Sequence, residues 1–132
     1  MTGVIIVSHS EKLAEGLRDI VMEMNDGSVE IIAAGGTGDG RVGTNTNRIK
    51  NAIETLQDKD QILIFVDLGS AVICSETAIE MLDDEGLQDK VHIVDAPLVE
   101  GVVGGVVQAT ICDDLDLIVA TAKEGATIQK VS

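Results

Sequence analysis

Residues 3–24 of the chain read GVIIVSHSEKLAEGLRDIVMEM, which joins a buried strand directly to an amphipathic helix. The run from Gly3 to Ser8 is short, apolar and rich in β-branched residues, as is typical of a strand covered on both faces in a parallel sheet. Ser10 then offers a side-chain cap for a helix, and Asn25-Asp26-Gly27 forms a stop signal. The residues that outline the apolar face between them are Leu13, Leu17, Ile20, Val21 and Met24.

The same unit repeats along the rest of the chain. Buried strands are predicted at Val29–Ala33, Gln61–Val66 and Val91–Val94, and helices at about Ala71–Asp84 and Leu115–Lys123. A further amphipathic helix is outlined by Ile49, Ala52, Ile53 and Leu56, and Leu98–Ile111 is an apolar stretch interrupted by glycine. Strands that alternate with helices in this rhythm predict a doubly wound α/β fold, with a mainly parallel sheet, helices on both faces and right-handed crossovers.

The C-terminal segment departs from this rhythm. Ala126–Val131 alternates in polarity like a half-buried strand, but too few residues remain for another crossover helix. We therefore expect a C-terminal edge or antiparallel strand there. A length of 132 residues suits one compact domain, and no linker or low-complexity block divides the sequence. Residues 1–132 are expected to form a single domain.

Composition narrows the classes of partner. The formal net charge is -14 and the 9 Lys and Arg residues are scattered, whereas nucleic-acid phosphates are bound by clustered cations. Nucleic acid is therefore not expected as a partner. No apolar run approaches the ~20 residues of a membrane span and the N-terminus has no signal-peptide pattern, so we expect a cytoplasmic protein without membrane association. Cys74 and Cys112 lack metal-ligand spacing, which predicts buried free thiols rather than a metal site or a redox pair.

Polar residues gather just after the predicted strands, where ligands bind in open parallel sheets. His9 follows the first strand at the mouth of a helix, where free backbone N–H groups and the helix dipole favour an anion such as a phosphate. Asp67 follows the third strand. If these strands are neighbours, its carboxylate can hold one ring nitrogen of His9 and leave the other as a nucleophile. The alternatives are an ordinary loop histidine and an aspartate helix cap, and the cap is compatible with the pairing.

The loop after the second strand carries a weak nucleotide-binding signal. Gly38–Gly43 fits GxGxxG, but it follows the second strand rather than the first, and the chain has 14 glycines. A Walker A loop is excluded because Gly43 stands where its lysine is required. A flavodoxin-like or receiver-like domain stays open as an alternative, although a receiver needs an acidic cluster where this chain has Ser8-His9-Ser10. His92 lies inside the fourth strand, where a packing role is expected.

Four loop motifs at successive strand ends are more specific together than any one of them. They are GVIIVSHSEKLAEGL at residues 3–17, AAGGTGDGRVGT at 33–44, FVDLGSA at 65–71 and DAPLVEG at 95–101. In this order along the whole chain they resemble the phosphotransferase subunits of dihydroxyacetone kinase, relatives of the mannose-type enzyme IIA domains. The resemblance implies a cytoplasmic homodimer that can exchange its terminal strand.

The resemblance also implies a chemistry. His9 matches the histidine that takes a phosphoryl group from phospho-HPr of the sugar phosphotransferase system, and Asp67 matches the carboxylate that orients it. The group then passes to ADP on a separate kinase subunit. Fused HPr-like domains of some relatives are missing from these 132 residues, so we expect dependence on free HPr. A mannose-type enzyme IIA that serves a sugar permease shares this logic and stays open as an alternative.

Several residues near the strand ends are candidates to bind or orient the phosphoryl group. They are Ser10, Thr37, Thr44, Gly69 and Ser70. Hydroxyls in Gly-rich loops are more often turn or cap residues, which is the alternative role for these side chains. No metal or cofactor is expected, because a phosphorylated imidazole has a high transfer potential and needs positioning more than a resident metal.

Overall fold

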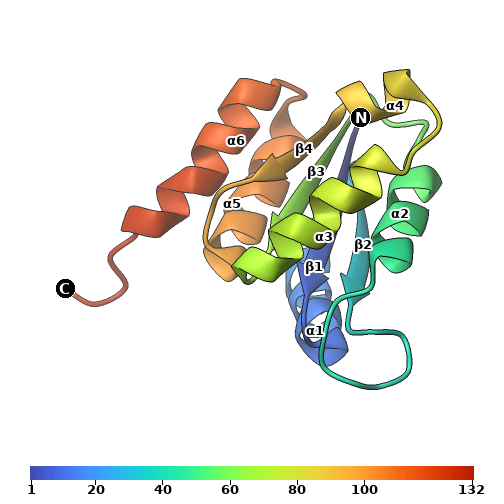
Figure 1. Cartoon of the computed structure of the whole chain (residues 1–132). Helices are drawn as coiled ribbons and strands as arrows, with labels where there is room; N and C mark the ends of the chain where they lie inside the picture. The colour runs from blue at the N-terminus through green and yellow to red at the C-terminus, as the bar shows by residue number, and fades with distance from the viewer.

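The computed structural model describes residues 1–132 and contains one four-stranded sheet (Figure 1). Its strands are β1 (Thr2–Ser8), β2 (Glu30–Gly35), β3 (Gln61–Val66) and β4 (Val91–Val94). All neighbouring pairs are parallel, in the order β2-β1-β3-β4, so the predicted parallel α/β sheet is confirmed. The bounds of β3 and β4 are those predicted, because charged residues flank both runs at each end.

Helices cover both faces of this sheet, as expected for a doubly wound fold. One face carries α1 (Glu11–Met22), α5 (Leu98–Ile111) and α6 (Leu115–Glu124). The other carries α2 (Thr46–Thr55), α3 (Gly69–Glu80) and the short α4 (Glu85–Asp89). The longest of them, α5, has 14 residues, and none of the helices has the length and apolar character to cross a membrane.

The helix predicted at Ala71–Asp84 is α3, which begins two residues earlier and stops four residues earlier than predicted. α3 ends at Glu80, and α4 begins at Glu85 with Asp84 as its cap. The Asp84 carboxylate accepts hydrogen bonds from the backbone N–H groups of Gly86 and Leu87, which starts a new helix instead of extending the old one.

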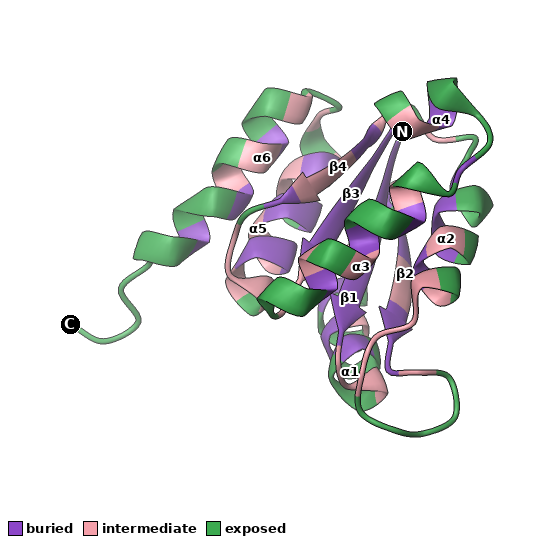
Figure 2. Ribbon diagram, viewed as in Figure 1, coloured by how far each residue is buried: buried purple, intermediate pink, exposed green.

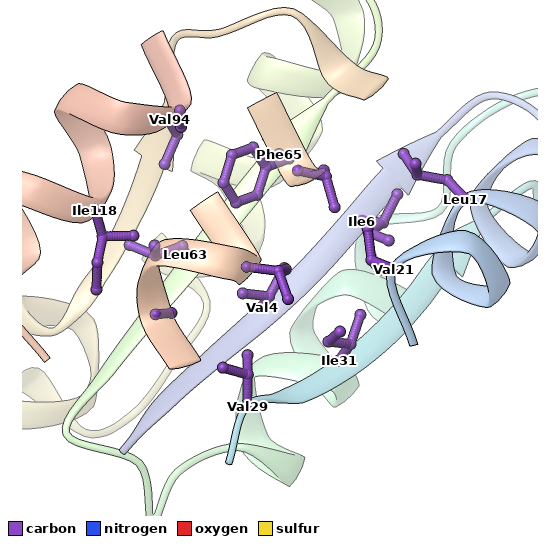
Figure 3. Close-up of a cluster of buried hydrophobic side chains, with 14 of the residues drawn as sticks. Val4, Ile6, Leu17, Val21, Val29, Ile31, Leu63, Phe65, Val94 and Ile118 are labelled. Atoms are coloured by element: carbon purple, nitrogen blue, oxygen red, sulfur yellow. The ribbon is translucent and has the colours of Figure 1, made fainter. Parts of the chain in front are cut away.

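Alternate residues of the central strands fill two separate cores. Val4, Ile6, Leu63 and Phe65 point toward the layer of α1, α5 and α6 (Figure 3), and the residues between them point toward α2 and α3. Figure 2 shows the central strands buried between the two helix layers. Phe65, the single aromatic residue, lies against α5 at Gly105, where a Cβ atom would come within 3.0 Å of its ring.

The apolar face predicted for α1 is only partly the buried one. Leu17 and Val21 are buried together with Ala14, but Leu13, Ile20 and Met24 are 44%, 49% and 47% exposed. The helix also ends at Met22, before the predicted stop at Asn25-Asp26-Gly27. The face toward the sheet is narrow because α1 lies close to β2: a Cβ atom at Gly35 would come within 2.7 Å of the Ala14 methyl group. The exposed apolar side chains lie along one side of the buried stripe that Ala14, Leu17 and Val21 form.

The prediction of a C-terminal strand at Ala126–Val131 is wrong for the single chain. Gly125–Thr127 forms a 3-10 turn after α6, and residues 128–132 have no regular secondary structure. The segment runs away from the sheet (Figure 1), with Lys130 paired to Glu100 at 2.5 Å. A strand forms only beside a sheet edge with unpaired backbone groups, and α6 leads the tail away from both edges.

Candidate active site

The site lies at the carboxyl ends of the two central strands. β1 runs next to β3, so His9 and Asp67, which follow these strands directly, are neighbours in space although 58 positions apart. The chain passes from β1 to β2 on one side and reaches β3 on the other, so the strand order reverses at this point. Such a switch point opens a crevice where α/β proteins bind ligands.

The His9 ring is held from both sides. Its Nδ1 atom lies 3.0 Å from Asp67 Oδ1, and its Nε2 atom lies 2.6 Å from Ser70 Oγ. The side chains of His9 and Asp67 are 22% and 14% exposed, so the pair is shielded but remains open to a partner. The structure therefore brings together three of the residues proposed from the sequence.

Asp67 is the centre of a dense hydrogen-bond network. Its Oδ1 accepts from the His9 ring and from the Leu68 backbone N–H (2.8 Å), and its Oδ2 accepts from the Ser8 hydroxyl and the His9 backbone N–H, both at 2.9 Å. Burial raises the pKa of this carboxyl, but the hydrogen bonds from His9, Ser8 and Leu68 outweigh it and lower the pKa below its ordinary value. Asp67 is therefore ionised at neutral pH.

An ionised carboxylate can only accept hydrogen bonds, which decides the state of the histidine. The contact between His9 Nδ1 and Asp67 Oδ1 requires a proton on Nδ1. In the neutral ring Nε2 then carries a lone pair, so the Ser70 hydroxyl is the donor in the second contact. The arrangement presents Nε2 as a nucleophile.

Ser70 and Gly69 lie in the first turn of α3. The N-cap residue of this helix is Leu68, whose side chain makes no capping hydrogen bond. The first backbone N–H groups of a helix have no partner within the helix, and together with the helix dipole they favour an anion. An anion bonded to His9 Nε2 would thus lie at the uncapped end of a 12-residue helix.

Ser10 has the other role that the sequence allowed for it. Its side chain caps α1, accepting a hydrogen bond from the Leu13 backbone N–H at 3.1 Å. Ser8 was not among the candidates, yet its buried hydroxyl contacts Asp67. Its position as the last strand residue before His9 was the one signal in the sequence that pointed to it.

The Gly-rich loop between β2 and α2 approaches the His9 backbone. Gly43 donates its N–H to the carbonyl of His9 at 2.8 Å, a contact made with a φ of 143° that favours glycine. The Thr37 hydroxyl donates to the Asp39 carboxylate, and the Thr44 hydroxyl lies 3.0 Å from Cys74 Sγ. Both hydroxyls are thus engaged inside the loop or with α3.

Other features of the sequence lie outside this site. The GxGxxG match at Gly38–Gly43 belongs to a loop after β2, the second strand of the chain. His92 is half-buried in β4. Cys74 and Cys112 are free thiols but are half-buried rather than buried, because each lies at the border of a core cluster.

Comparisons with known proteins identify the family of this chain. Residues 3–119 match the model of the EIIA-man family, described as “PTS system fructose IIA component”. The chain belongs to the EIIA-man family. Proteins with similar sequences include subunits named DhaM, so the resemblance based on the four loop motifs is confirmed.

Two relatives of this EIIA-man chain differ in how much of their own length the chain covers. It is 48% identical over 111 residues to the phosphoryl donor subunit DhaM of PEP-dependent dihydroxyacetone kinase 2 from Listeria innocua, covering 84% of this chain and 88% of the relative. It is 39% identical over 134 residues to the DhaM subunit of Providencia stuartii, covering 99% of this chain but 25% of that relative. The EIIA-man chain thus spans about a quarter of the longer relative.

A solved structure shows the same fold. The crystal structure of EF1359, a protein of unknown function, matches the EIIA-man chain with a TM-score of 0.84 and 37% sequence identity. The match covers 93% of each chain.

Proposed function

We propose that this chain is a phosphoryl carrier in which His9 takes a phosphoryl group from phospho-HPr and passes it to ADP on a partner subunit of dihydroxyacetone kinase. The observation that supports it best is the His9 ring itself. Asp67 holds its protonated Nδ1, while Nε2 faces Ser70 at the uncapped start of α3. This arrangement combines a directed nucleophile with a site for the anion that it receives.

Two substitutions at phosphorus make up the proposed transfer. The Nε2 lone pair attacks the phosphorus of phospho-HPr, and the P–N bond to the donor imidazole breaks as the bond to His9 forms. An oxygen of the ADP β-phosphate then attacks the same phosphorus, the P–N bond to His9 breaks, and ATP is released. The ring returns to its neutral form with the proton still on Nδ1.

Asp67 and Ser70 have separate roles in these steps. Phosphorylation of Nε2 makes the imidazole ring cationic, and the ionised Asp67 at Nδ1 stabilises that charge. The Ser70 hydroxyl, which donates to Nε2 in the free protein, turns to a phosphoryl oxygen once the nitrogen is occupied. The N–H groups of Gly69 and Ser70 add the helix N-terminus to the same cradle. The transfer needs positioning rather than a resident metal or cofactor.

The kinase is proposed from the relatives, which are named phosphoryl donor subunits of PEP-dependent dihydroxyacetone kinases. HPr as donor and ADP as acceptor are proposed from the family resemblance of the four loop motifs. We extend the proposal to a cytoplasmic homodimer that acts on protein partners and not on nucleic acid or membranes. A net charge of -14 fits this choice, because it repels phosphate backbones and anionic lipid surfaces.

A second candidate is an enzyme IIA that serves a sugar permease, which the family description as a fructose component favours. Nucleotide binding has less support. The largest cleft, of about 610 Å³ between α3 and the end of β4, is lined by Asp67, Glu76 and Asp95 and by no basic residue. The cleft therefore offers no cationic side chain for the several phosphate charges of a nucleotide.

Labelled phosphoryl transfer distinguishes these functions. The protein is mixed with enzyme I, HPr and labelled phosphoenolpyruvate, then with the ADP-binding kinase subunit and ADP, or with a permease IIB domain. We expect acid-labile, alkali-stable label on the wild-type protein, none on His9→Ala, and label in ATP only when the kinase subunit is present. Label that persists in His9→Ala would refute the role of His9, and preferred transfer to IIB would support the permease function.

A further inference from the structure

We propose that Ser8 is a positioning residue whose buried hydroxyl holds Asp67 in the orientation that presents the His9 ring. The inference deepens the proposed phosphoryl transfer and rests on it for its catalytic meaning. Ser8 is 0% exposed, so it cannot touch HPr, a kinase subunit or any other partner. Its effect on the reaction must therefore pass through the residues that it contacts.

The direction of both hydrogen bonds of this hydroxyl is determined by its partners. Ser8 Oγ lies 2.9 Å from Asp67 Oδ2, and an ionised carboxylate only accepts, so the hydroxyl donates there. The Ser10 backbone N–H lies 3.0 Å from the same oxygen and only donates, so the hydroxyl accepts there. One buried atom thus joins the ends of β1 and β3 to the start of α1.

The other contacts of Asp67 show why this bond matters. Oδ1 accepts hydrogen bonds from the His9 ring and the Leu68 N–H, and Oδ2 accepts them from the His9 N–H and the Ser8 hydroxyl. Ser8 is the only side chain on Oδ2. Without its hydroxyl a single backbone N–H restrains that oxygen, the carboxylate turns more freely about its side-chain torsion, and the hold on His9 Nδ1 loosens.

The geometry also supports a through-bond effect. Donation from Ser10 N–H polarises the Ser8 hydroxyl, which strengthens its own donation to Asp67. The only titratable side chain hydrogen-bonded to Asp67 is the His9 ring, and the Ser8 hydroxyl is one of the donors that lower the pKa of the Asp67 carboxyl. Loss of the Ser8 bond should therefore move the titration of the Asp67 carboxyl toward higher pH.

The experiment compares Ser8→Ala with Ser8→Thr, which keeps a hydroxyl. Thr2→Val is the matched control, because Thr2 is a buried hydroxyl at the far end of the same strand, bonded to Gln61. Two NMR quantities are measured in each full-length variant: the ¹⁵N chemical shifts of the His9 ring, and the midpoint of the pH titration of the ¹³C chemical shift of the Asp67 carboxyl carbon. The kinetic quantities are kcat and KM for phospho-HPr. Thermal unfolding is recorded alongside.

We expect Ser8→Ala to lower kcat roughly tenfold, as for the loss of one hydrogen bond to a charged group, with KM unchanged. The Asp67 midpoint should rise, and the His9 nitrogens should show a mixture of tautomers. Thr2→Val should lose thermal stability and change neither NMR signal. Ser8→Thr should restore the wild-type values.

A double-mutant cycle with Asp67→Asn tests whether Ser8 acts through Asp67, even if the threonine methyl group does not fit. Ser8→Ala should have no further effect on kcat in the Asp67→Asn background. Additive effects, or wild-type ¹⁵N shifts and carboxyl midpoint in Ser8→Ala, would overturn the inference. The NMR signals are measured without phospho-HPr, so they decide the role of Ser8 even if the proposed transfer partner is wrong.

Discussion

Replacing Asp67 by asparagine tests the site most directly. The carboxylate accepts four hydrogen bonds, two on each oxygen, whereas an amide accepts on one arm only. In either orientation the NH₂ group faces hydrogen-bond donors. The backbone N–H groups of His9 and Leu68 are among these donors, and neither can become an acceptor. The arm toward the ring is the easier one to change, because His9 can move its proton from Nδ1 to Nε2 and accept from the amide. The nucleophilic lone pair is then lost.

The size of the effect follows from these contacts. A hydrogen bond to a charged group contributes about 1.5–3 kcal/mol, and Asp67→Asn loses two of them. A neutral amide costs less to bury than a carboxylate, which offsets part of this loss. We expect the free energy of unfolding to fall by about 2–4 kcal/mol, which leaves a domain of this size folded. Transfer should slow at least about a hundredfold, or about 2.7 kcal/mol, because the reactive tautomer becomes a minor species.

The assay is the rate of labelling by phospho-HPr, with ¹⁵N NMR of the His9 ring to identify the tautomer. Asp39→Asn is the control: this carboxylate also accepts from a hydroxyl and from Arg41, but it lies in the exposed Gly-rich loop. Asp39→Asn should transfer at nearly the wild-type rate. A wild-type rate in Asp67→Asn, or a ring that keeps its proton on Nδ1, would refute the proposed role and reduce Asp67 to a helix cap.

Three further predictions concern stability and assembly. Burial raises the pKa of Asp67, but its hydrogen bonds lower it by more, to below the ordinary 3.8. The stabilisation from Asp67 is therefore complete above about pH 4 and is lost as the pH falls through the folded pKa. In urea unfolding, the stability gap between wild type and Asp67→Asn should shrink below that pH, and a gap that stays constant would contradict the linkage. Gly105→Ala brings a Cβ atom to 3.0 Å from the Phe65 ring and should lower the melting temperature, whereas Gly16→Ala, with no atom within 4 Å, should raise it. Removal of residues 126–132 should weaken dimerisation and lower the melting temperature while His9 still accepts label; an unchanged dimer in sedimentation would place the interface on the helices instead.

The sequence by itself determined the layered α/β architecture and much of the site. Strands such as Gln61–Val66 are short apolar runs bounded by charged residues, and this pattern depends on neighbours in the chain alone. His9 and Asp67 could be paired because parallel strands bring their carboxyl ends to one edge of the sheet. The pairing still depended on β1 and β3 being adjacent, a fact of strand order that no local pattern contains.

Only the tertiary structure decided which groups complete the site and which apolar residues are covered. Ser8 and Ser70 contact Asp67 and His9 across 59 and 61 positions, so their roles depend on how α3 and β1 meet. On α1, Leu13 and Ile20 have the spacing of core residues but are exposed, because the close approach to β2 leaves room for a narrow stripe. The tail at Ala126–Val131 alternates like a strand, yet without a sheet edge beside it the single chain leaves its backbone unpaired. Periodicity reports what a segment can bury, and packing between segments decides what it does bury.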